Sequence, residues 1–259
     1  MLLAIDIGNT ETTVGLFAGD RLAGHWRLHS TPRRTPDEWA SVFTAQLTQA
    51  GHSTQEIRAA IVASVAPPIT QSLCEGVESA TTREPVLVDA RSKLPIVLDV
   101  DEPLTVGADR IVNTLAASQL FKKDTIVVDF GTATTFDCIT SDGRFIGGVI
   151  MPGLRTASDE LVRRTAKLPA TELTPPTHAI GRRTEDCIRA GVLWGTADAV
   201  DGLVRRITAE WPTKRQPMTI ATGGLASLVA PLCKSIESVQ PDLTLVGLRI
   251  AAAALGLRW

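Results

Sequence analysis

The sequence predicts an α/β fold of two similar lobes, each a mixed β-sheet flanked by helices. An apolar strand, a Gly-containing turn and a β-branched strand occur at residues 2–17 and again at 125–139. The two copies are far apart, since Asp6 and Asp129 are separated by 123 residues, close to half of the 259-residue chain. Strand-like and helix-like segments alternate between and after them. These observations together indicate a duplicated domain.

The first half begins with a hairpin and continues with alternating helix and strand signals. Residues 2–7 are apolar apart from Asp6, and Gly8-Asn9-Thr10 is a turn signal before the β-branched run 12–17. Thr35-Pro36-Asp37-Glu38 is typical of a helix N-terminus. We therefore expect helices over residues 36–49 and 108–121, and strands over 22–28, 57–65 and 85–88.

The second half repeats the alternation and defines the expected lobes. We expect a hairpin at 125–139, helices at 154–168, from 184 onward and at 248–257, and strands at 218–222 and 243–246. The boundary is expected near residues 115–125. This gives an N-terminal lobe of residues 1–118 and a C-terminal lobe of residues 119–259, with the active site in the cleft between them.

Composition excludes several classes of protein. Residues AVILMFWYC make up 44% of the chain, charged residues 21%, and the net charge is −2, which is a normal globular balance. There is no cluster of five or six basic residues, so we expect neither nucleic-acid binding nor anionic-lipid binding. The longest uncharged run, 216–233, is interrupted by Pro and Gly and is a poor membrane span. With no signal-peptide pattern at the start of the chain, we expect a cytoplasmic location.

Cysteine and histidine spacing argues against disulfides and a protein-built zinc site. The cysteines at 74, 138, 187 and 233 lie far apart, and we expect them to be small buried hydrophobic residues. His25 and His29 lack the Glu of the H-E-x-x-H motif, and their segment is predicted to be a strand.

The two Gly-containing turns are the main chemical signal. A tight turn presents backbone N–H groups to phosphate oxygens, and Gly lets the backbone approach closely. The carboxylate beside each turn, Asp6 or Asp129, is the kind of ligand that hydrated Mg²⁺ uses together with phosphates and waters. One such turn is more often plain turn chemistry, whereas two in equivalent positions of a duplicated α/β chain favour a phosphate site. No G-x-x-x-x-G-K-[ST] motif is present, which excludes a P-loop enzyme.

Two further motifs have both a structural and a functional interpretation. Gly107-Ala108-Asp109-Arg110 begins a predicted helix, where Asp is favoured by the helix dipole but Arg is not. The pair can cap the helix or bind a hydroxyl and an anion. Thr222-Gly223-Gly224 follows a predicted strand and is either a strand-to-helix turn or a place where an adenine ring lies against the backbone.

Six motifs follow one another along the chain: Asp6–Thr10, Gly107–Arg110, Asp129–Thr135, Gly147–Leu154, Thr222–Gly224 and Leu243–Leu248. Together they resemble the type III pantothenate kinases of the actin/hexokinase/heat-shock-chaperone ATPase superfold over essentially the whole chain. The resemblance implies ATP-dependent phosphorylation of pantothenate to 4'-phosphopantothenate, the first step of coenzyme A biosynthesis. It also implies a homodimer, Mg²⁺ and a requirement for K⁺ or NH₄⁺. Two alternative functions are considered. A different small-molecule kinase of the superfold would keep both turns but need not keep G-A-D-R. A non-catalytic regulator is expected to lose Asp6, Asp109 or Asp129, and all three are present.

The resemblance also assigns roles to matching residues. Asp109 is implied to be the proton acceptor, Asp129 the K⁺ ligand, and Asp6 the residue that holds Mg²⁺ through water. The implied ATP-binding residues are Asp6, Ile7, Gly8, Asn9, Thr10, Glu11, Thr12, Thr13, Thr132, Gly223 and Gly224. The implied pantothenate-binding residues are Val100, Gly107, Ala108, Asp109, Arg110 and Thr184; on sequence alone Thr184 is an N-cap. Val100 stands where the family usually has a Tyr that lines the pantothenate pocket. This difference leaves the reaction intact and bears on the affinity for pantothenate.

Overall fold

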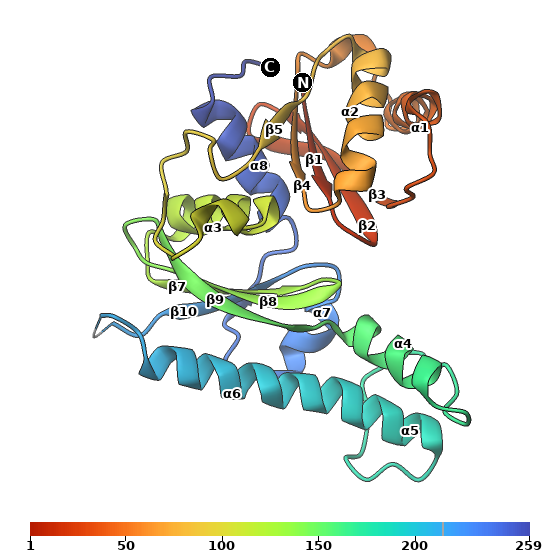
Figure 1. Ribbon diagram of the computed structural model, residues 1–259, viewed down its shortest axis with the longest axis vertical. Coiled ribbons are helices and arrows are strands. Elements are labelled where there is room, and N and C mark those ends of the chain that lie inside the picture. The colour runs from red at the N-terminus through yellow and green to blue at the C-terminus, as the bar shows by residue number, and fades with distance from the viewer. Residues whose placement is uncertain (214) are drawn as a thin grey trace. The chain divides into compact units, whose positions relative to one another are not determined.

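The computed structural model describes residues 1–213 and 215–259, which divide into two compact units (Figure 1). Unit 1 is Met1–Gln119 together with Leu243–Trp259, and unit 2 is Leu120–Asp242. The first division falls one residue from the expected boundary at 118/119. Residues 243–259 were expected in the C-terminal lobe but belong to unit 1, because helix α8 (Leu243–Ala254) packs on the first sheet.

The sheet of unit 1 is mixed. Its strands are β1 (Leu2–Ile7), β2 (Glu11–Ala18), β3 (Arg21–His29), β4 (Ala59–Ser64) and β5 (Val86–Val88), in the order β3-β2-β1-β4-β5. The β1–β2 and β2–β3 pairs are antiparallel, whereas β4 pairs in parallel with both β1 and β5. The β1–β2 turn therefore lies at the carboxyl end of the parallel strands.

Helices cover both faces of this sheet (Figure 1). Side chains alternate between the faces along a strand, so Leu3 and Ile5 of β1 pack with α1 and α2, while Leu2 and Ala4 pack with α3 and α8. The helices are α1 (Pro36–Gln49), α2 (Pro67–Thr81), α3 (Ala108–Phe121) and α8, with 3₁₀ turns at Thr54–Glu56 and Pro103–Thr105 and a short strand β6 (Val97–Leu98).

The sheet of unit 2 repeats the pattern of unit 1. Its strands are β7 (Thr125–Phe130), β8 (Ala133–Ile139), β9 (Arg144–Pro152), β10 (Met218–Thr222) and β11 (Ser238–Val239). Within the unit they run in the order β9-β8-β7-β10-β11, with β7–β8 and β8–β9 antiparallel and β7–β10 and β10–β11 parallel. The prediction of two similar α/β lobes with mixed sheets is confirmed.

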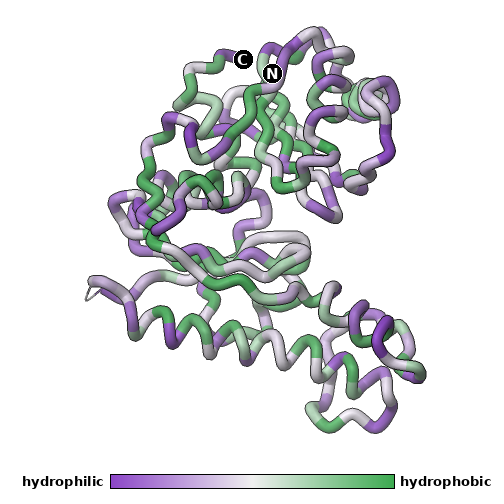
Figure 2. The backbone as a smooth tube through the Cα atoms, in the orientation of Figure 1, coloured by the Kyte–Doolittle hydropathy of each residue, from purple (hydrophilic) through white to green (hydrophobic). Residues whose placement is uncertain are grey.

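A long helical segment packs on the unit 2 sheet. It consists of α5 (Thr184–Arg189), a π-helical turn (Ala190–Trp194) and α6 (Gly195–Ala209), and the unit also contains α4 (Leu154–Arg164), α7 (Ala226–Val229) and a 3₁₀ turn at Ala230–Leu232. Hydropathy alternates along α6 in Figure 2, as expected for an amphipathic helix. Its apolar side, including Val200 and Val204, joins Phe136 and Ile126 of the sheet in one core.

Most expected elements are present, with three corrections. The helices at 36–49 and 108–121 and the strand at 218–222 have the predicted bounds. The strand expected at 243–246 is wrong, because this apolar run forms the first turn of α8 and packs into a helix–sheet core. The helix expected over 154–168 ends at Arg164, since Thr165 is extended. Helix α2 was not anticipated.

The cysteines only partly follow expectation. All four are free and Cys138 is buried, but Cys187 is exposed on the first turns of α5, where its Sγ donates to Gly181 O at 3.4 Å. Burial raises the pKa of Cys74 to about 11 and that of Cys233 to about 12. In the part of the chain that is described, no helix has the length and apolar character needed to cross a membrane.

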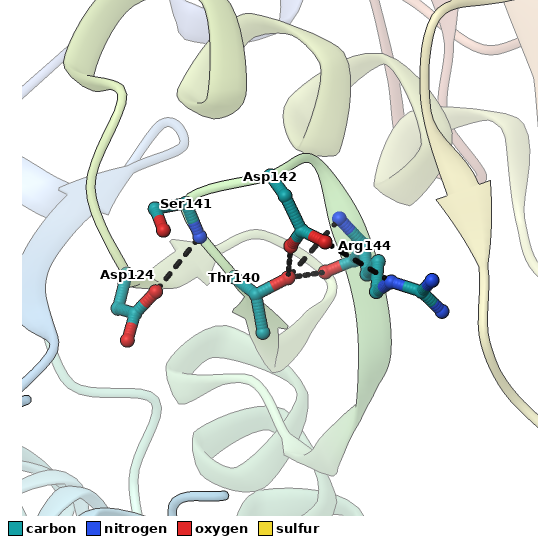
Figure 3. Close-up of polar contacts among 5 residues, drawn as sticks. All are labelled: Asp124, Thr140, Ser141, Asp142 and Arg144. Atoms are coloured by element: carbon teal, nitrogen blue, oxygen red, sulfur yellow. Dashed lines mark hydrogen bonds and ion pairs between the residues drawn. The ribbon is translucent and has the colours of Figure 1, made fainter. Parts of the chain in front are cut away.

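A buried carboxylate, Asp124, anchors the amino end of β7 (Figure 3). It accepts hydrogen bonds from Ser141 N at 2.8 Å, Trp211 Nε1 at 3.0 Å and Thr213 Oγ1 at 2.8 Å. Burial opposes ionisation, but these hydrogen bonds outweigh it and lower the pKa of Asp124. Asp124 ties the β8–β9 turn to the chain after α6, at the end of β7 remote from Asp129, so its role is structural.

Candidate active site

The first predicted phosphate turn joins β1 to β2. Gly8 N donates to Glu11 O at 3.0 Å, and a Cβ on residue 8 would lie 2.7 Å from that oxygen, so the turn requires Gly. Asn9, Thr10 and Glu11 are exposed at its tip. Asp6 and Thr13 are paired across the hairpin and are partly exposed.

Two residues assigned to this turn have buried side chains. Ile7 packs in the core beneath α1 and α2, and Thr12 is fully buried with its Oγ1 3.0 Å from Ser30 Oγ. Their side chains therefore support the turn from below. The exposed tip and Asp6 are the parts of the turn able to meet a ligand.

The second predicted turn joins β7 to β8 and is one residue shorter than the first. Gly131 N donates to Ala133 O at 3.1 Å, and Thr132 is exposed at the tip. Asp129 precedes the turn by the same distance as Asp6 precedes the first, and it is paired with Thr222 at the end of β10. Both turns thus place an aspartate at the carboxyl end of a central strand.

The structure brings Gly223 against Asp129. Gly223 has a φ of +92°, and a Cβ there would lie closer than 3.0 Å to Asp129 Oδ1 and 2.7 Å from Phe130 N. Only Gly satisfies both the conformation and the close approach. Gly224 follows as an exposed residue. Asp129, the second turn and the Gly pair therefore form one continuous group at this edge of the unit 2 sheet.

The G-A-D-R segment lies beside the first turn in unit 1. A Cβ on Gly107 would lie 3.3 Å from Val65 Cγ1, and Val65 N donates to Ile7 O at 3.0 Å. Ala108 is buried in the core shared by α3 and α8. Through Val65 the start of α3 is thus next to the end of β1, where Asp6 and the first turn lie.

Asp109 is the one carboxyl group of the G-A-D-R segment, and its surroundings shift its pKa. Its Oδ1 accepts from Arg110 N at 2.8 Å, and a Cβ on Gly107 would lie 2.5 Å from the same oxygen, so Gly107 makes space for the carboxylate. Burial raises the pKa of Asp109, and the N–H and guanidinium of Arg110 offset part of that rise. A partly exposed carboxyl group with a raised pKa is suited to proton transfer.

Val100 and Thr184 are not joined to these groups by the contacts of the described residues. Val100 is partly buried in the segment between β6 and the turn at Pro103–Thr105. Thr184 is exposed as the first residue of α5. The N-cap is Arg183, so the prediction that Thr184 caps the helix is wrong by one residue.

Sequence reasoning did not single out Ser30 or Thr156, and it included Gly153 only as part of the motif Gly147–Leu154, yet all three contact the turns. Ser30 Oγ donates to Gly8 O at 2.6 Å, and Thr156 Oγ1 donates to Thr132 O at 2.6 Å. Gly153 N also donates to Thr132 O, at 3.1 Å. The 123-residue offset that relates Asp6 to Asp129 also relates Ser30 to Gly153, so the duplication could have pointed to these two positions. It gives no such indication for Thr156.

The chain is similar to known proteins over nearly its whole length. The family model described as type III pantothenate kinase matches residues 2–206. A type III pantothenate kinase of Moorella thermoacetica is 42% identical over 96% of this chain and 98% of its own, and one of Thermomicrobium roseum is 43% identical over 97% and 96%. Among solved structures, the ROK hexokinase of Thermus thermophilus superposes with a TM-score of 0.50 at 15% identity, covering 98% of this chain and 97% of its own, which concerns the fold alone.

Proposed function

Because this chain belongs to the type III pantothenate kinase family, we propose that it transfers the γ-phosphoryl group of ATP to pantothenate, forming 4'-phosphopantothenate. This reaction is the first step of coenzyme A biosynthesis. The observation that carries the proposal is the family match over residues 2–206, which includes both turns and the G-A-D-R segment. Such an enzyme works in the cytoplasm, where we place the protein.

The roles of individual residues follow from their positions. The exposed tip of the first turn and Thr132 of the second are suited to ATP phosphates, and the Gly223-Gly224 backbone to the adenine ring. Gly107–Arg110 would bind pantothenate, with Val100 and Thr184 as further contacts. Asp109 would orient the primary hydroxyl and accept its proton late, because a loose phosphoryl-transfer transition state depends mainly on positioning and charge neutralisation.

The acidic residues fit the two cations that the family implies. Among the described residues no three His, Cys, Asp or Glu side chains gather into a metal cluster, which agrees with a Mg²⁺ held mostly by water and phosphate, with Asp6 as its single protein carboxylate. The Asp129 carboxylate, which the missing side chain of Gly223 accommodates, would be an oxygen ligand for a monovalent cation such as K⁺ or NH₄⁺. Bound cations would neutralise phosphate charge.

The cation assignment predicts a salt effect. The chain has no Lys in either hairpin, so a monovalent cation beside Asp129 would supply positive charge where many kinases use Lys. Replacing K⁺ and NH₄⁺ by Na⁺ at constant ionic strength is expected to lower kcat at least about tenfold, since removing an electrostatic stabiliser costs roughly 10²–10³. The measurement is ADP release in each chloride salt. Equal rates in Na⁺ would remove Asp129 from this role.

The raised pKa of Asp109 predicts the pH profile. Asp109 accepts a proton only when ionised, so kcat/KM falls as pH drops through its pKa in the free enzyme. Because burial raises this pKa, the acidic limb is expected above the ordinary aspartate value of 3.8. The measurement is kcat/KM for pantothenate from acidic to neutral pH. A limb at or below 3.8 in an enzyme that stays folded would contradict the assignment.

The direct test of the function is acceptor dependence. Purified protein with ATP, Mg²⁺ and K⁺ is expected to release ADP only when pantothenate is added, and mass spectrometry should detect 4'-phosphopantothenate. Pantothenate-free buffer and a sugar acceptor serve as controls. ADP release without pantothenate, or with the sugar alone, would indicate a plain ATPase or a different kinase of the superfold.

We also expect the protein to be a homodimer. The helical segment 184–209 buries one side in the unit 2 core but leaves Trp194 40% exposed, and Ile180 nearby in sequence is 85% exposed. Exposed large apolar side chains on and before one helix are typical of an interface. Light scattering at micromolar concentration should give about twice the 27.6 kDa chain mass. A mass of one chain would contradict the dimer.

A further inference from the structure

The two turns are held by equivalent backbone hydrogen bonds. In each unit the residue directly after the third strand of the sheet donates its N–H to a carbonyl of the turn. Ser30, after β3, donates to Thr10 O at 3.0 Å, and Gly153, after β9, donates to Thr132 O at 3.1 Å. Because Ser30 and Gly153 are 123 residues apart, this bond is part of the duplication.

Each turn also receives a hydrogen bond from a side-chain hydroxyl, supplied in two different ways. In unit 1 the hydroxyl belongs to Ser30, which donates to Gly8 O at 2.6 Å and lies 3.0 Å from Thr12 Oγ1. In unit 2 it belongs to Thr156 in α4, which donates to Thr132 O at 2.6 Å.

Packing excludes a side-chain hydroxyl at position 153 of unit 2. A Cβ on Gly153 would lie closer than 3.0 Å to both Gly131 O and Thr132 O, so no side chain fits at the position equivalent to Ser30. The hydroxyl comes instead from three residues further on, at the exposed first turn of α4. Ser30 and Thr156 therefore each donate a short hydrogen bond to a turn, but to different carbonyls: Gly8 O belongs to the first residue of its turn, whereas Thr132 O is the carbonyl that also accepts from Gly153 N.

A hydroxyl bonded to a turn carbonyl affects how the turn meets an anion. A carbonyl oxygen that faces a phosphate repels it, whereas an N–H attracts it. A donor that holds the carbonyl fixes the orientation of that peptide group, and the N–H of the same trans peptide then points the opposite way. The bonds from Ser30 and Thr156 thus favour the form of each turn in which its N–H groups are available to phosphate.

We propose that Ser30 and Thr156 are positioning residues that set the two turns for the phosphates of a bound nucleoside triphosphate. The proposal rests on the proposed function insofar as the turns bind ATP. It extends that function by assigning each turn a supporting hydroxyl from outside the hairpin. Neither hydroxyl needs to touch the nucleotide.

The test compares matched variants of the full-length protein. Ser30→Ala removes the first hydroxyl, and Thr31→Ala removes a neighbouring one that donates to His29 O at 3.4 Å rather than to the turn. Thr156→Ala removes the second hydroxyl, and Thr156→Ser retains it. Thr165→Ala, whose hydroxyl donates to Leu161 O at 2.7 Å, is the control for unit 2. Calorimetry with Mg·ADP and Mg·ATP gives affinities, kinetics give KM and kcat, and thermal melting reports the fold.

The proposal predicts a specific pattern. Ser30→Ala and Thr156→Ala should each weaken nucleotide binding and raise KM for ATP about tenfold, with KM for pantothenate within about twofold of the original. Thr156→Ser should restore most of the affinity, and both control variants should match the original protein. Thr156→Ala should melt close to the original protein, whereas Ser30→Ala should melt a few degrees lower because the buried Thr12 hydroxyl loses its partner, so affinities are compared well below both melting temperatures.

Three results would overturn it. The first is unchanged nucleotide affinity in folded Ser30→Ala and Thr156→Ala, the second is a Thr156→Ser variant as weak as Thr156→Ala, and the third is equal loss in the control variants. Failure of the proposed function is a separate result: the original protein would bind Mg·ATP yet not phosphorylate pantothenate. In that case the calorimetric comparison would still decide whether the hydroxyls position the turns.

Discussion

Replacing Asp109 by Asn is expected to lower kcat at least about 100-fold while the protein stays folded. Asn retains the structural contact, because its side-chain oxygen can accept the bond that Asp109 Oδ1 takes from Arg110 N at 2.8 Å. It loses the negative charge and the ability to accept the hydroxyl proton. General-base assistance is typically worth about 10²–10⁴ in rate, or roughly 3–5 kcal/mol of barrier.

The kinetic pattern distinguishes this role from helix capping. An interaction made mainly in the transition state lowers kcat and kcat/KM together, so both should fall while the affinity for Mg·ATP stays near the original value. Asp101→Asn, at an exposed position in the preceding segment, is the control and should be fully active. An Asp109→Asn enzyme with a kcat within a few-fold of the original would return Asp109 to a capping role. The same conclusion would follow if the variant were partly unfolded but its folded fraction had normal activity.

Replacing Gly247 by Ala is expected to destabilise the protein by about 2–3 kcal/mol. Gly247 lies where α8 crosses α3, and a Cβ there would lie closer than 3.0 Å to Val112 O and 3.1 Å from Val112 Cβ. The obstructing oxygen belongs to the main chain of a buried helix and cannot rotate away as a side chain would. The two helices must therefore separate, which disturbs the core that they share beneath the sheet.

Gly202→Ala is the matched control because it makes the same change at an open position of a helix. A Cβ there would lie no closer than 3.8 Å to another side chain, at Arg205 Nη2, so the substitution causes no clash. The higher helix propensity of Ala than of Gly is then expected to stabilise the protein by about 0.5–1 kcal/mol. Thermal melting should show opposite shifts, with Gly247→Ala lower by roughly 4–12 °C and Gly202→Ala slightly higher. A Gly247→Ala protein as stable as the original would show that the two helices can part without cost.

Elements specified by local chemistry were predictable from the sequence. The start of α1 at Pro36 is an example, because Thr35 and Glu38 form a capping box in which Glu38 Oε2 accepts from Thr35 N at 2.7 Å. The two turns were equally visible, since Gly8 and Gly131 follow an aspartate on an apolar strand. For the candidate site, this local signal located Asp6, Asp129 and their turns.

Features specified by distant packing were not predictable in this way. The apolar run at 243–246 suits a strand as well as a buried helix, and only its fit between α3 and the sheet decides for the helix. Ser30 and Thr156 carry no motif of their own, because their significance lies in which carbonyl each hydroxyl reaches. Gly223 was recognisable as a turn residue, whereas its contact with Asp129 depends on the parallel pairing of β7 and β10.

The return of the chain's last 17 residues to unit 1 sets the order in which the protein can be completed during translation. Unit 2 is continuous and has all its residues once synthesis reaches Asp242, whereas unit 1, although synthesised first, lacks α8 until synthesis reaches Ala254. Until then the face of its sheet bearing Leu2, Ala4 and Ile61 is missing one of its two covering helices. The nascent chain therefore carries an incompletely covered apolar sheet face for most of its synthesis, the kind of surface that chaperones bind and that makes prematurely terminated chains prone to aggregate.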